Sequence, residues 1–406
     1  MSYICMVVDG AYPKDIRVRK EAEALVKNGR NVLVVCPNDT QSIKEDVVNG
    51  VHVYRIGTNY TTSKKGIYDI IESVININPF FYLGLKKVFR KYKIDFLHVH
   101  DLQLAGTGYL FKNKVKSLVL DLHENFPEAL KTWFKWRKSK LVKIKNFIFM
   151  NPKIWSKKEE RYCKKYDKVI CVVEEMKERI ILKCQFNSDK FFVIRNAEEK
   201  SFQNFFDENK IQNLFNKNVF SITYVGGFGP HRGLDTAIKG MPYVVKKIPE
   251  AKLFLVGKGN KDIESKLREL VKENDVEKYV NFVGYKPFNE VSAIMSNSDI
   301  NIIPHNKDAQ TDCGLPHKFF QIMMSKSLLL VSSCKPLKRI VETYDAGIVF
   351  EADNPKDFAL KVIDTYTNFD SLKYKSNNAY DAVMNQGENW EEESKKLIDL
   401  YNDLVS

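Results

Sequence analysis

The sequence lacks the cysteine pattern of a disulfide-stapled or zinc-binding protein. Its seven cysteines are odd in number and scattered along the chain, and no two of them form a C-x-x-C pair. This spacing argues for reduced thiols in a cytoplasm and against both a disulfide framework and a zinc site.

Long apolar runs are also missing. No run approaches the roughly 18 apolar residues that a membrane-spanning helix needs. The apolar start of the chain, M-S-Y-I-C-M-V-V, is too short for a signal sequence. We therefore expect a cytoplasmic protein that contacts a membrane only peripherally, at the inner face of the cell membrane.

The length and the charge of the chain narrow its class. With 406 residues it is too long for one ordinary core, which predicts two domains. The formal net charge of +13 attracts polyanions such as nucleic acid, anionic lipid or phosphorylated substrates, but it does not indicate a fold.

Apolar segments alternate with helical ones along the whole chain, which predicts an α/β fold. The predicted strands of the first half are residues 3–8, 31–36, 51–56, 96–100, 118–122, 166–172 and 191–194. Those of the second half are residues 220–225, 251–256, 279–283, 299–303 and 328–331. A helical region over residues 68–92 is broken near Asn78 and Pro79.

Four successive strands of the second half run into glycine or proline. Gly226-Gly227-Phe228-Gly229 lacks the G-x-G-x-x-G spacing and is a weak signal alone. Four such turns, with Arg232 and Lys318 among them, indicate backbone that phosphates and sugars can approach closely.

The stretch 304–333 joins a polar loop, a helix and a buried strand. Pro316 suits the first turn of a helix, so a helix is predicted to begin near Leu315. Lys318, Gln321 and Ser325 then share a polar stripe. Free N–H groups at the helix start, with the charge of Lys318, predict an anion site. An ordinary surface helix is the alternative.

Three histidines lie on predicted strands of the first half or follow them. His98 and His100 share a face of one strand, but no third ligand is in view, so we expect a structural or hydrogen-bonding role. His123 follows strand 118–122, next to an acidic residue and before a proline, where a ligand-facing side chain would lie. The alternative is a histidine that ties down its loop.

Residues 131–158 interleave lysines with Trp, Phe and Ile and contain no carboxylate. This combination suits a segment that lies in the headgroup region of an anionic membrane. Single-stranded nucleic acid is a second ligand of such segments, and a solvated face of a core helix is the bland alternative. We favour the membrane and expect no nucleic acid partner.

The polar, Asn-rich segment 197–218 is predicted to be a linker between two domains. The first domain would comprise residues 1–196 and the second residues 219–385. An amphipathic helix in the final segment, 386–406, is predicted to cross back and brace the first domain.

Several segments resemble the GT-B-fold glycosyltransferases of family 4, or glycosyl transferases group 1. They are Y-P-K-D-I-R-V-R-K-E-A-E-A-L, D-L-H-E-N-F-P-E, Y-V-G-G-F-G-P-H-R-G-L-D, L-F-L-V-G-K-G, V-N-F-V-G-Y and L-P-H-K-F-F-Q-I-M. The resemblance covers nearly the whole chain and is loosest over residues 40–95 and 130–165. It implies two Rossmann-like domains that face each other across a cleft, the first for the acceptor and the second for a nucleotide sugar.

The resemblance also implies roles for individual residues. The catalytic residues would be His123, Arg232 and Lys318. The diphosphate would contact Gly226, Gly227, Leu315, Arg232 and Lys318, and the nucleoside would contact Gly257, Gly284, Tyr285 and Gln321. The donor sugar would contact Asp312, Cys313, Gly314 and His123, and the acceptor side would include Asp9, Gly10, Asp15 and Arg17.

Two positions depart from the family pattern. Gln321 stands where the family usually has the second glutamate of its E-x7-E motif, so a hydrogen bond to ribose is kept but the charge is lost. Gly227 stands where many relatives have an arginine, which leaves Arg232 and Lys318 as the main cationic pair.

The activity implied is that of a retaining hexosyltransferase that needs no metal or cofactor. A hexose or N-acetylhexosamine would move from a nucleotide diphosphate sugar, preferably a UDP-sugar, to a lipid-linked or glycan acceptor in bacterial cell-surface polysaccharide synthesis. The alternatives are a catalytically weak nucleotide-sugar-binding subunit and a sugar-nucleotide 2-epimerase.

Overall fold

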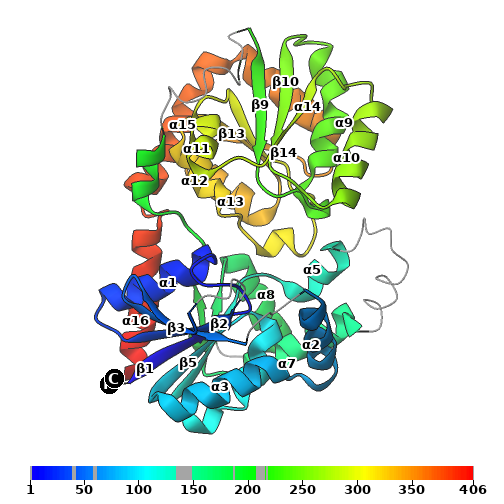
Figure 1. Cartoon of the computed structure of the whole chain (residues 1–406). Coiled ribbons are helices and arrows are strands. Elements are labelled where there is room, and N and C mark those ends of the chain that lie inside the picture. The colour runs from blue at the N-terminus through cyan, green and yellow to red at the C-terminus, as the bar shows by residue number, and fades with distance from the viewer. Residues whose placement is uncertain are drawn as a thin grey trace. The chain divides into compact units, whose positions relative to one another are not determined.

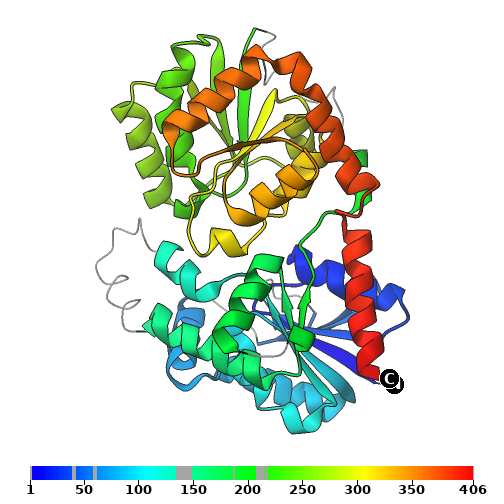
Figure 2. The same cartoon turned by 180° about the vertical axis from the view of Figure 1, so that it is seen from behind.

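The computed structural model describes residues 2–38, 43–57, 62–133, 149–185, 188–206, 215 and 218–405. The chain divides into two compact units. The first contains the described parts of residues 1–130, 141–195 and 393–406, and the second consists mainly of residues 196–392. Figures 1 and 2 show the units from opposite sides.

The first unit is built on an eight-stranded sheet with the order β3-β4-β2-β1-β5-β6-β7-β8. Its strands are β1 (Tyr3–Val7), β2 (Val32–Pro37), β3 (Glu45–Val48), β4 (Val51–Ile56), β5 (Ile94–His100), β6 (Ser117–Leu122), β7 (Lys168–Cys171) and β8 (Phe191–Val193). Neighbouring strands are parallel except for β3 and β4. Every residue of β2 and β6 is buried, as expected for a parallel sheet covered by helices on both faces.

Eight described helices belong to this first unit, wholly or in large part. They are α1 (Ile16–Lys27), α2 (Thr62–Ile75), α3 (Pro79–Lys91), α4 (Ala105–Tyr109), α5 (Phe126–Trp133), α7 (Pro152–Lys165), α8 (Glu174–Cys184) and α16 (Trp390–Val405). Local chemistry sets several of their boundaries. The Asp15 carboxylate accepts a hydrogen bond from the N–H of Val18 and caps α1. Asn78 caps α3, and Pro79 occupies its first turn, which produces the predicted break between α2 and α3.

The second unit is built on a six-stranded sheet with the order β11-β10-β9-β12-β13-β14. Its strands, all parallel, are β9 (Phe220–Val225), β10 (Ala251–Val256), β11 (Val280–Gly284), β12 (Ile300–Ile303), β13 (Leu328–Ser332) and β14 (Ile348–Phe350). Its helices are α9 (Leu234–Val245), α10 (Lys261–Glu273), α11 (Phe288–Ser296), α12 (Lys318–Met324), α13 (Lys335–Thr343), α14 (Pro355–Thr367) and α15 (Phe369–Met384). The apolar faces of α9, α10 and α14 pack on the sheet in one continuous core.

Two described parts of the chain differ from the sequence prediction. Strands β3 and β14 were not predicted, because both are short and neither is a buried apolar run. Residues 197–206 of the predicted linker belong to the second unit. There Phe202 is buried, and its ring centroid lies 5.2 Å from that of Phe288. The Ser292 hydroxyl donates a hydrogen bond to the carbonyl oxygen of Phe205. Aromatic residues spaced along a polar segment were the signal for this packing.

The C-terminal helix returns to the first unit, as predicted. Helix α16 begins at Trp390, and residues 393–406 cluster with the first unit. Leu397, Leu400 and Tyr401 are buried there.

No helix in the described part of the chain is long and apolar enough to cross a membrane. Within the basic aromatic segment, residues 134–148 lie outside the described residues. The described remainder is the end of α5 and the region around the start of α7.

Candidate functional site

In both units the strand order reverses beside one strand. β1 lies between β2 and β5, and β9 lies between β10 and β12. Open α/β sheets bind ligands outside the carboxyl ends of the strands at such reversal points. The candidate residues of each unit gather at its own reversal point.

Two loops of the second unit meet at its reversal point through a close backbone contact. Gly233 precedes α9 with a φ of +66°, and a Cβ atom there would lie 1.6 Å from the carbonyl oxygen of Pro304. The N–H of Asn306 also donates to the carbonyl oxygen of His231. Glycine at position 233 therefore permits an approach that no other residue allows, and it brings Arg232 beside the loop after β12.

A histidine that the sequence analysis did not single out orients Arg232. The Nη1 atom of Arg232 lies 3.1 Å from Nε2 of His305, a side chain that is 4% exposed. Burial and the charges of Arg232 and Lys318 hold the pKa of His305 well below its ordinary value. The neutral ring accepts the guanidinium hydrogen bond at Nε2, so its own proton is on Nδ1. Burial and the same two cations lower the pKa of His231 to about 3.

Lys318 has a buried amine without an ion pair or hydrogen bond among the described residues. Its Nζ atom lies 3.4 Å from the centroid of the Tyr224 ring. A Cβ atom at Gly226 would come within 3.3 Å of the same nitrogen. Burial and the charge of Arg232 hold the pKa of Lys318 well below its ordinary value. The structure therefore brings Lys318 and Arg232 close enough for their charges to interact, at a glycine turn.

Three glycines line the adjacent strand ends of this sheet. Gly226, Gly257 and Gly284 have φ values of +136°, +134° and +82°. A Cβ atom at Gly257 would lie 2.0 Å from the carbonyl oxygen of Gly226, so the two backbones touch. At Gly227, in contrast, a Cβ atom would meet nothing closer than 4.0 Å, and glycine is not required by packing.

The helix predicted near Leu315 begins at Lys318 instead. The N–H of Phe319 bonds to the carbonyl oxygen of Pro316, which closes a turn before α12, and α12 itself is seven residues long. So short a helix has little dipole, and its start is not a phosphate site by itself. The anion-binding capacity of this stretch lies in the side chain of Lys318.

Other residues of the predicted donor site lie around this centre. Leu315 and Cys313 are buried, and Gly314 is extended with a φ of −149°. The Asp312 carboxylate accepts a hydrogen bond of 2.9 Å from the N–H of Lys335. Tyr285 is 71% exposed, and the Lys258 amine lies 5.5 Å from its ring centroid, so this ring is available for stacking.

Gln321 has a carboxylate beside it that the sequence analysis missed. Its Nε2 atom donates to Oε2 of Glu198 at 2.7 Å, and Nε2 of His317 lies 3.1 Å from the same oxygen. Both Gln321 and Glu198 are buried. Glu198, which comes from a distant segment, therefore places a carboxylate beside Gln321, the position at which the family pattern has a glutamate.

The reversal point of the first unit is organised by a buried ion pair. Nη2 of Arg17 lies 2.9 and 3.1 Å from the two carboxylate oxygens of Asp121, at the end of β6. Arg17 also donates to the carbonyl oxygen of Ile194. Its guanidinium is fully engaged and 5% exposed. Asp15 caps α1, while Asp9 and Gly10 lie in the loop between β1 and α1.

Three imidazoles surround one oxygen of Asp121. Its Oδ2 atom lies 3.6 Å from a ring nitrogen of each of His98, His100 and His123. His98 and His100 are stacked with their centroids 4.4 Å apart, and Nδ1 of His100 lies 3.1 Å from Nε2 of His123. The predicted hydrogen-bonding role of His98 and His100 fits this arrangement.

His123 is the partly exposed member of the group. Burial alone would lower its pKa, but Asp101 and Asp121 outweigh burial and raise it to about 9. Its Nδ1 atom lies 3.6 Å from Oδ2 of Asp101. Asp101 follows β5 with a φ of +69°, a strained conformation for a residue with a side chain.

These buried groups include the donor types of a metal site. Glu21, His98, His100 and Asp121 place four donor atoms within 4.8 Å of one another, so further ligand types do accompany the histidine pair. However, the guanidinium of Arg17 contacts both acids, with Nε 3.1 Å from Oε1 of Glu21. A fixed cation at this position repels a metal ion, so the group fits a hydrogen-bonded charge network.

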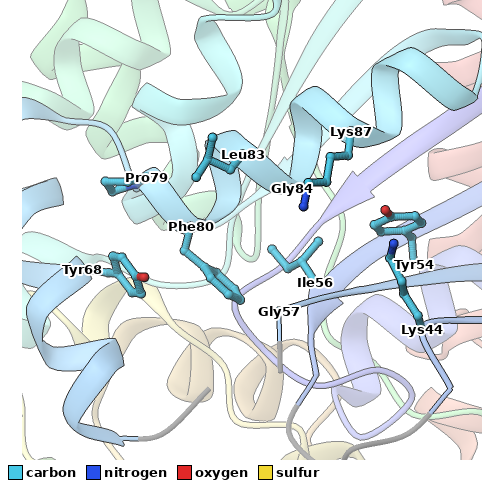
Figure 3. Close-up of a pocket in the computed structure, with 10 residues that line it drawn as sticks. All are labelled: Lys44, Tyr54, Ile56, Gly57, Tyr68, Pro79, Phe80, Leu83, Gly84 and Lys87. Atoms are coloured by element: carbon cyan, nitrogen blue, oxygen red, sulfur yellow. The ribbon is translucent and has the colours of Figure 1, made fainter. Parts of the chain in front are cut away.

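A separate pocket of about 240 Å³ opens beside β4 in the same unit. Figure 3 shows Lys44, Lys87 and Tyr54 toward one end and Tyr68 and Pro79 toward the other. Apolar side chains of β4 and α3 lie between them, and none of the lining residues is acidic. The chemistry of the pocket is therefore aromatic and cationic.

Comparison with known proteins assigns the chain to a family. Residues 16–197 match the family model of Glycosyltransferase Family 4, and residues 205–382 match that of Glycosyl transferases group 1. The chain belongs to the family 4 glycosyltransferases.

Two curated relatives of this family 4 member are similar over part of their length. An uncharacterized glycosyltransferase of Haemophilus influenzae is 28% identical over 203 residues, 50% of this chain and 52% of the relative. The phosphatidylinositol N-acetylglucosaminyltransferase GPI3 subunit of Saccharomyces cerevisiae is 21% identical over 59% of this chain and 51% of the relative. The chain thus spans about half the length of these two relatives.

Solved structures show the same GT-B fold. Sucrose-phosphate synthase from Thermosynechococcus elongatus has a TM-score of 0.79 at 16% identity, over 100% of this chain and 99% of that one. HepE from Anabaena in complex with UDP-glucose has a TM-score of 0.70 at 14% identity, over 99% and 100%.

Close backbone contact makes Gly257 a sharp test of the glycine-lined strand ends in this family 4 member. Gly257→Ala is expected to lower the free energy of unfolding by about 3 kcal/mol, from steric overlap with Gly226 and backbone strain. Gly284→Ala is the matched control, because a Cβ atom there meets nothing within 4 Å. It should cost only about 1 kcal/mol. Urea unfolding measures both, and equal losses would contradict the contact.

The charge state of His123 should make stability depend on pH. Its pKa in the folded protein is about 9, above the ordinary 6.5, so folding favours the protonated ring. That stabilisation is complete below about pH 6.5 and disappears as the pH rises through about 9. Thermal unfolding of wild type and His123→Gln should therefore differ at about pH 6 and converge at about pH 10. His52→Gln on β4 is the control, and a pH-independent difference for His123→Gln would refute the assignment.

Proposed function

We propose that the protein is a retaining glycosyltransferase of the hexosyltransferase type. It moves a hexose or N-acetylhexosamine from a nucleotide diphosphate sugar to a lipid-linked or glycan acceptor. The observation that carries the proposal is the buried Lys318 amine, which has no anionic partner among the described residues and lies near Arg232 at a glycine turn.

An anion is the ligand that such a pair requires. A buried ammonium without a hydrogen bond is costly, and a second cation nearby raises the cost. A diphosphate supplies negative charge and hydrogen-bond acceptors to both Lys318 and Arg232 at once. The glycines at 226 and 257 leave its oxygens room to approach the backbone.

The same groups lower the barrier to glycosyl transfer. The bond from the sugar to the diphosphate breaks through an oxocarbenium-like state, and negative charge grows on the departing phosphate. Preorganised donors aimed at such charge are each worth about 10² to 10³ in rate. His305 contributes by holding the Arg232 guanidinium in one orientation. In this proposal Arg232 and Lys318 stabilise the negative charge of the departing diphosphate without a metal ion.

The state of His123 matches a mechanism without a protein base. With a pKa of about 9, the ring is protonated at neutral pH and donates from both nitrogens. A ring that already carries both protons cannot accept the acceptor's proton. In the front-face retaining mechanism that we propose, the leaving phosphate oxygen takes that proton.

UDP is the proposed nucleotide. HepE, which shares the fold, was solved with UDP-glucose. The exposed ring of Tyr285 at the end of β11 is a stacking surface for a base. A thermal-shift panel of UDP-, GDP- and ADP-sugars separates the donors, because a ligand of the folded state raises the melting temperature.

A phosphate-bearing acceptor fits the first unit. The pocket in Figure 3 offers aromatic rings for a sugar face and the amines of Lys44 and Lys87 for an anion. It lies beside β4, and β2 alone separates β4 from β1. The ends of β4 and β1 are therefore about 10 Å apart, because neighbouring strands lie about 5 Å apart. A short oligosaccharide covers this distance. The similar GPI3 subunit has phosphatidylinositol in its name, which supports a lipid-linked acceptor.

We further propose that this acceptor is reached at an anionic membrane surface, in cell-surface polysaccharide synthesis. A groove of about 450 Å³ lies between α2 and α7, and its rim carries the exposed side chains of Val74, Ile154, Lys157 and Arg161. Apolar side chains beside cations are the combination that interfacial binding needs. Ile154, Lys157 and Arg161 follow helical spacing and share one stripe of α7.

A catalytically weak nucleotide-sugar-binding subunit is the second candidate. Gln321 favours it because the side chain lacks the usual charge, while Glu198 beside it favours an active enzyme. Release of free sugar or transfer to an acceptor supports the enzyme. Nucleotide-sugar binding without turnover supports the subunit, and release of an epimerised nucleotide sugar would indicate the epimerase.

Binding of a diphosphate should be coupled to proton uptake by Lys318. The pKa of this amine is depressed in the free protein, and a diphosphate beside it raises the pKa again. At pH values between the pKa of Lys318 in the free protein and that in the complex, binding of UDP-glucose takes up a proton, and the affinity falls as the pH rises through this range. Calorimetry in buffers of different ionisation enthalpy measures the uptake.

Lys318→Met keeps the length of the side chain and removes the charge. It should abolish the proton uptake and weaken binding by about ten- to a hundredfold, the worth of a charged hydrogen bond. Lys239→Met, at a half-exposed position on α9, is the matched control. Binding by the wild type without proton uptake at every pH across the range in which Lys318 titrates would exclude its proposed role.

Charge removal on α7 tests the membrane proposal. Lys157→Gln with Arg161→Gln should weaken binding to vesicles of phosphatidylserine and phosphatidylcholine about thirtyfold, because each basic residue is worth about 1 kcal/mol near such a surface. Lys246→Gln with Lys247→Gln removes two exposed charges from the second unit and serves as the control. Equal vesicle binding by both double variants would count against a specific membrane face.

A further inference from the structure

The buried network around Asp121 extends to the C-terminal helix. The hydroxyl of Tyr401, on α16, lies 3.0 Å from Nδ1 of His98 on β5. Both side chains are fully buried, and the phenyl ring of Tyr401 packs edge-on against Phe96. A residue near the end of the chain thus contacts the histidines at the reversal point of the first unit.

The positions of the protons in this network follow from its charges. Burial raises the pKa of Tyr401 well above its ordinary value, so the phenol keeps its proton. Burial lowers the pKa of His98, so its ring is neutral. Nε2 of His98 faces Oδ2 of Asp121 at 3.6 Å, which favours a proton on that nitrogen. Nδ1 of His98 therefore accepts the hydrogen bond from Tyr401.

Asp121 keeps the negative charge of the network. Burial alone would raise its pKa, but Arg17 and His123 outweigh burial and lower it well below the ordinary value. Burial and the neighbouring Asp121 raise the pKa of Glu21 instead. One ionised carboxylate, paired with Arg17, thus faces all three imidazoles.

His123 receives its orientation from the same network. Burial keeps the pKa of His100 well below its ordinary value, so its ring is neutral and Nδ1 of His100 accepts from the protonated Nε2 of His123. The other ring nitrogen of His123 faces Asp101. Both ring nitrogens of His123 therefore have side-chain partners: the buried His100, and Asp101 with its strained backbone.

We propose that Asp121 is a positioning residue, which holds His123 in one orientation as a hydrogen-bond donor, and that Tyr401 fixes the His98 ring on which this arrangement rests. The proposal rests on the proposed function for its effect on turnover, but the arrangement itself is testable without a substrate. Through Tyr401, the C-terminal helix α16 thus contributes a residue to the histidine network of the first unit, as well as packing against this unit.

The titration of His123 is the direct test. The groups that face it are Asp101 after β5, Asp121 on β6, His98 and His100 on β5, and Arg17 and Glu21 on α1. NMR of the imidazole signals should give a midpoint near 9 in the wild type. Asp121→Asn should lower it by about 1 to 3 pH units, because an opposite charge at this range is removed. Asp95→Asn, at the other end of β5, should leave it unchanged.

A paired variant guards against misfolding. Asp121→Asn alone leaves Arg17 buried without its carboxylate, whereas Arg17→Met with Asp121→Asn removes both charges of the pair. The midpoint of His123 should again fall, because Asp121 acts on it more strongly than Arg17 does. An unchanged midpoint in a folded double variant would overturn the role of Asp121.

Tyr401→Phe tests the other end of the network and keeps every charge. The wild type should show a slowly exchanging N–H signal from Nε2 of His98, and the variant should lose it, because the His98 ring loses the hydrogen bond at Nδ1 that fixes its orientation. A retained signal would remove Tyr401 from the proposal.

In turnover assays Asp121→Asn should lower kcat more than it raises the KM for the donor. An inactive wild type with the expected midpoints would refute the proposed function but leave the network intact.

Discussion

The reversal of strand order beside β1 and beside β9 is the constraint on which the candidate residues of each unit depend. Parallel strands require crossover connections, and at a reversal point these connections leave to opposite sides of the sheet. The loops at the carboxyl ends of the two central strands are then adjacent. This topology brings Arg232 to His305 in the second unit, and Asp121 to His100 in the first.

The two reversal points carry opposite electrostatic arrangements. In the first unit the charges are already paired, since Arg17 neutralises Asp121 and the acids stabilise the His123 imidazolium. In the second unit Lys318 is buried without an ion pair among the described residues, and Arg232 is held by a neutral histidine. A satisfied network keeps a side chain in place, whereas an unsatisfied one provides binding energy for an anion.

Much of the fold followed from the sequence because parallel strands are short apolar runs between punctuating residues. Residues 51–56, 220–225 and 251–256 were predicted with the bounds of β4, β9 and β10. The segment with Phe202 was read as a linker because its composition is polar, and only packing against Phe288 shows otherwise. The start of α12 was misplaced because Pro316 fits both the first turn of a helix and the turn that precedes one.

The site residues divide along the same line. Sequence motifs pointed to Lys318, Arg232 and His123 because each lies just after a glycine turn or a strand, where local order reveals position. The partners of these residues come from distant segments: His305 for Arg232, Glu198 for Gln321, and Arg17 with Tyr401 for the histidines. Sequence by itself determined which groups carry the chemistry, since charge, periodicity and turn propensity are local properties. Only the tertiary structure decided which of these groups are paired and which, like Lys318, have no hydrogen-bond partner among the described residues. The reason is that burial and proximity arise when strands far apart in the chain become neighbours.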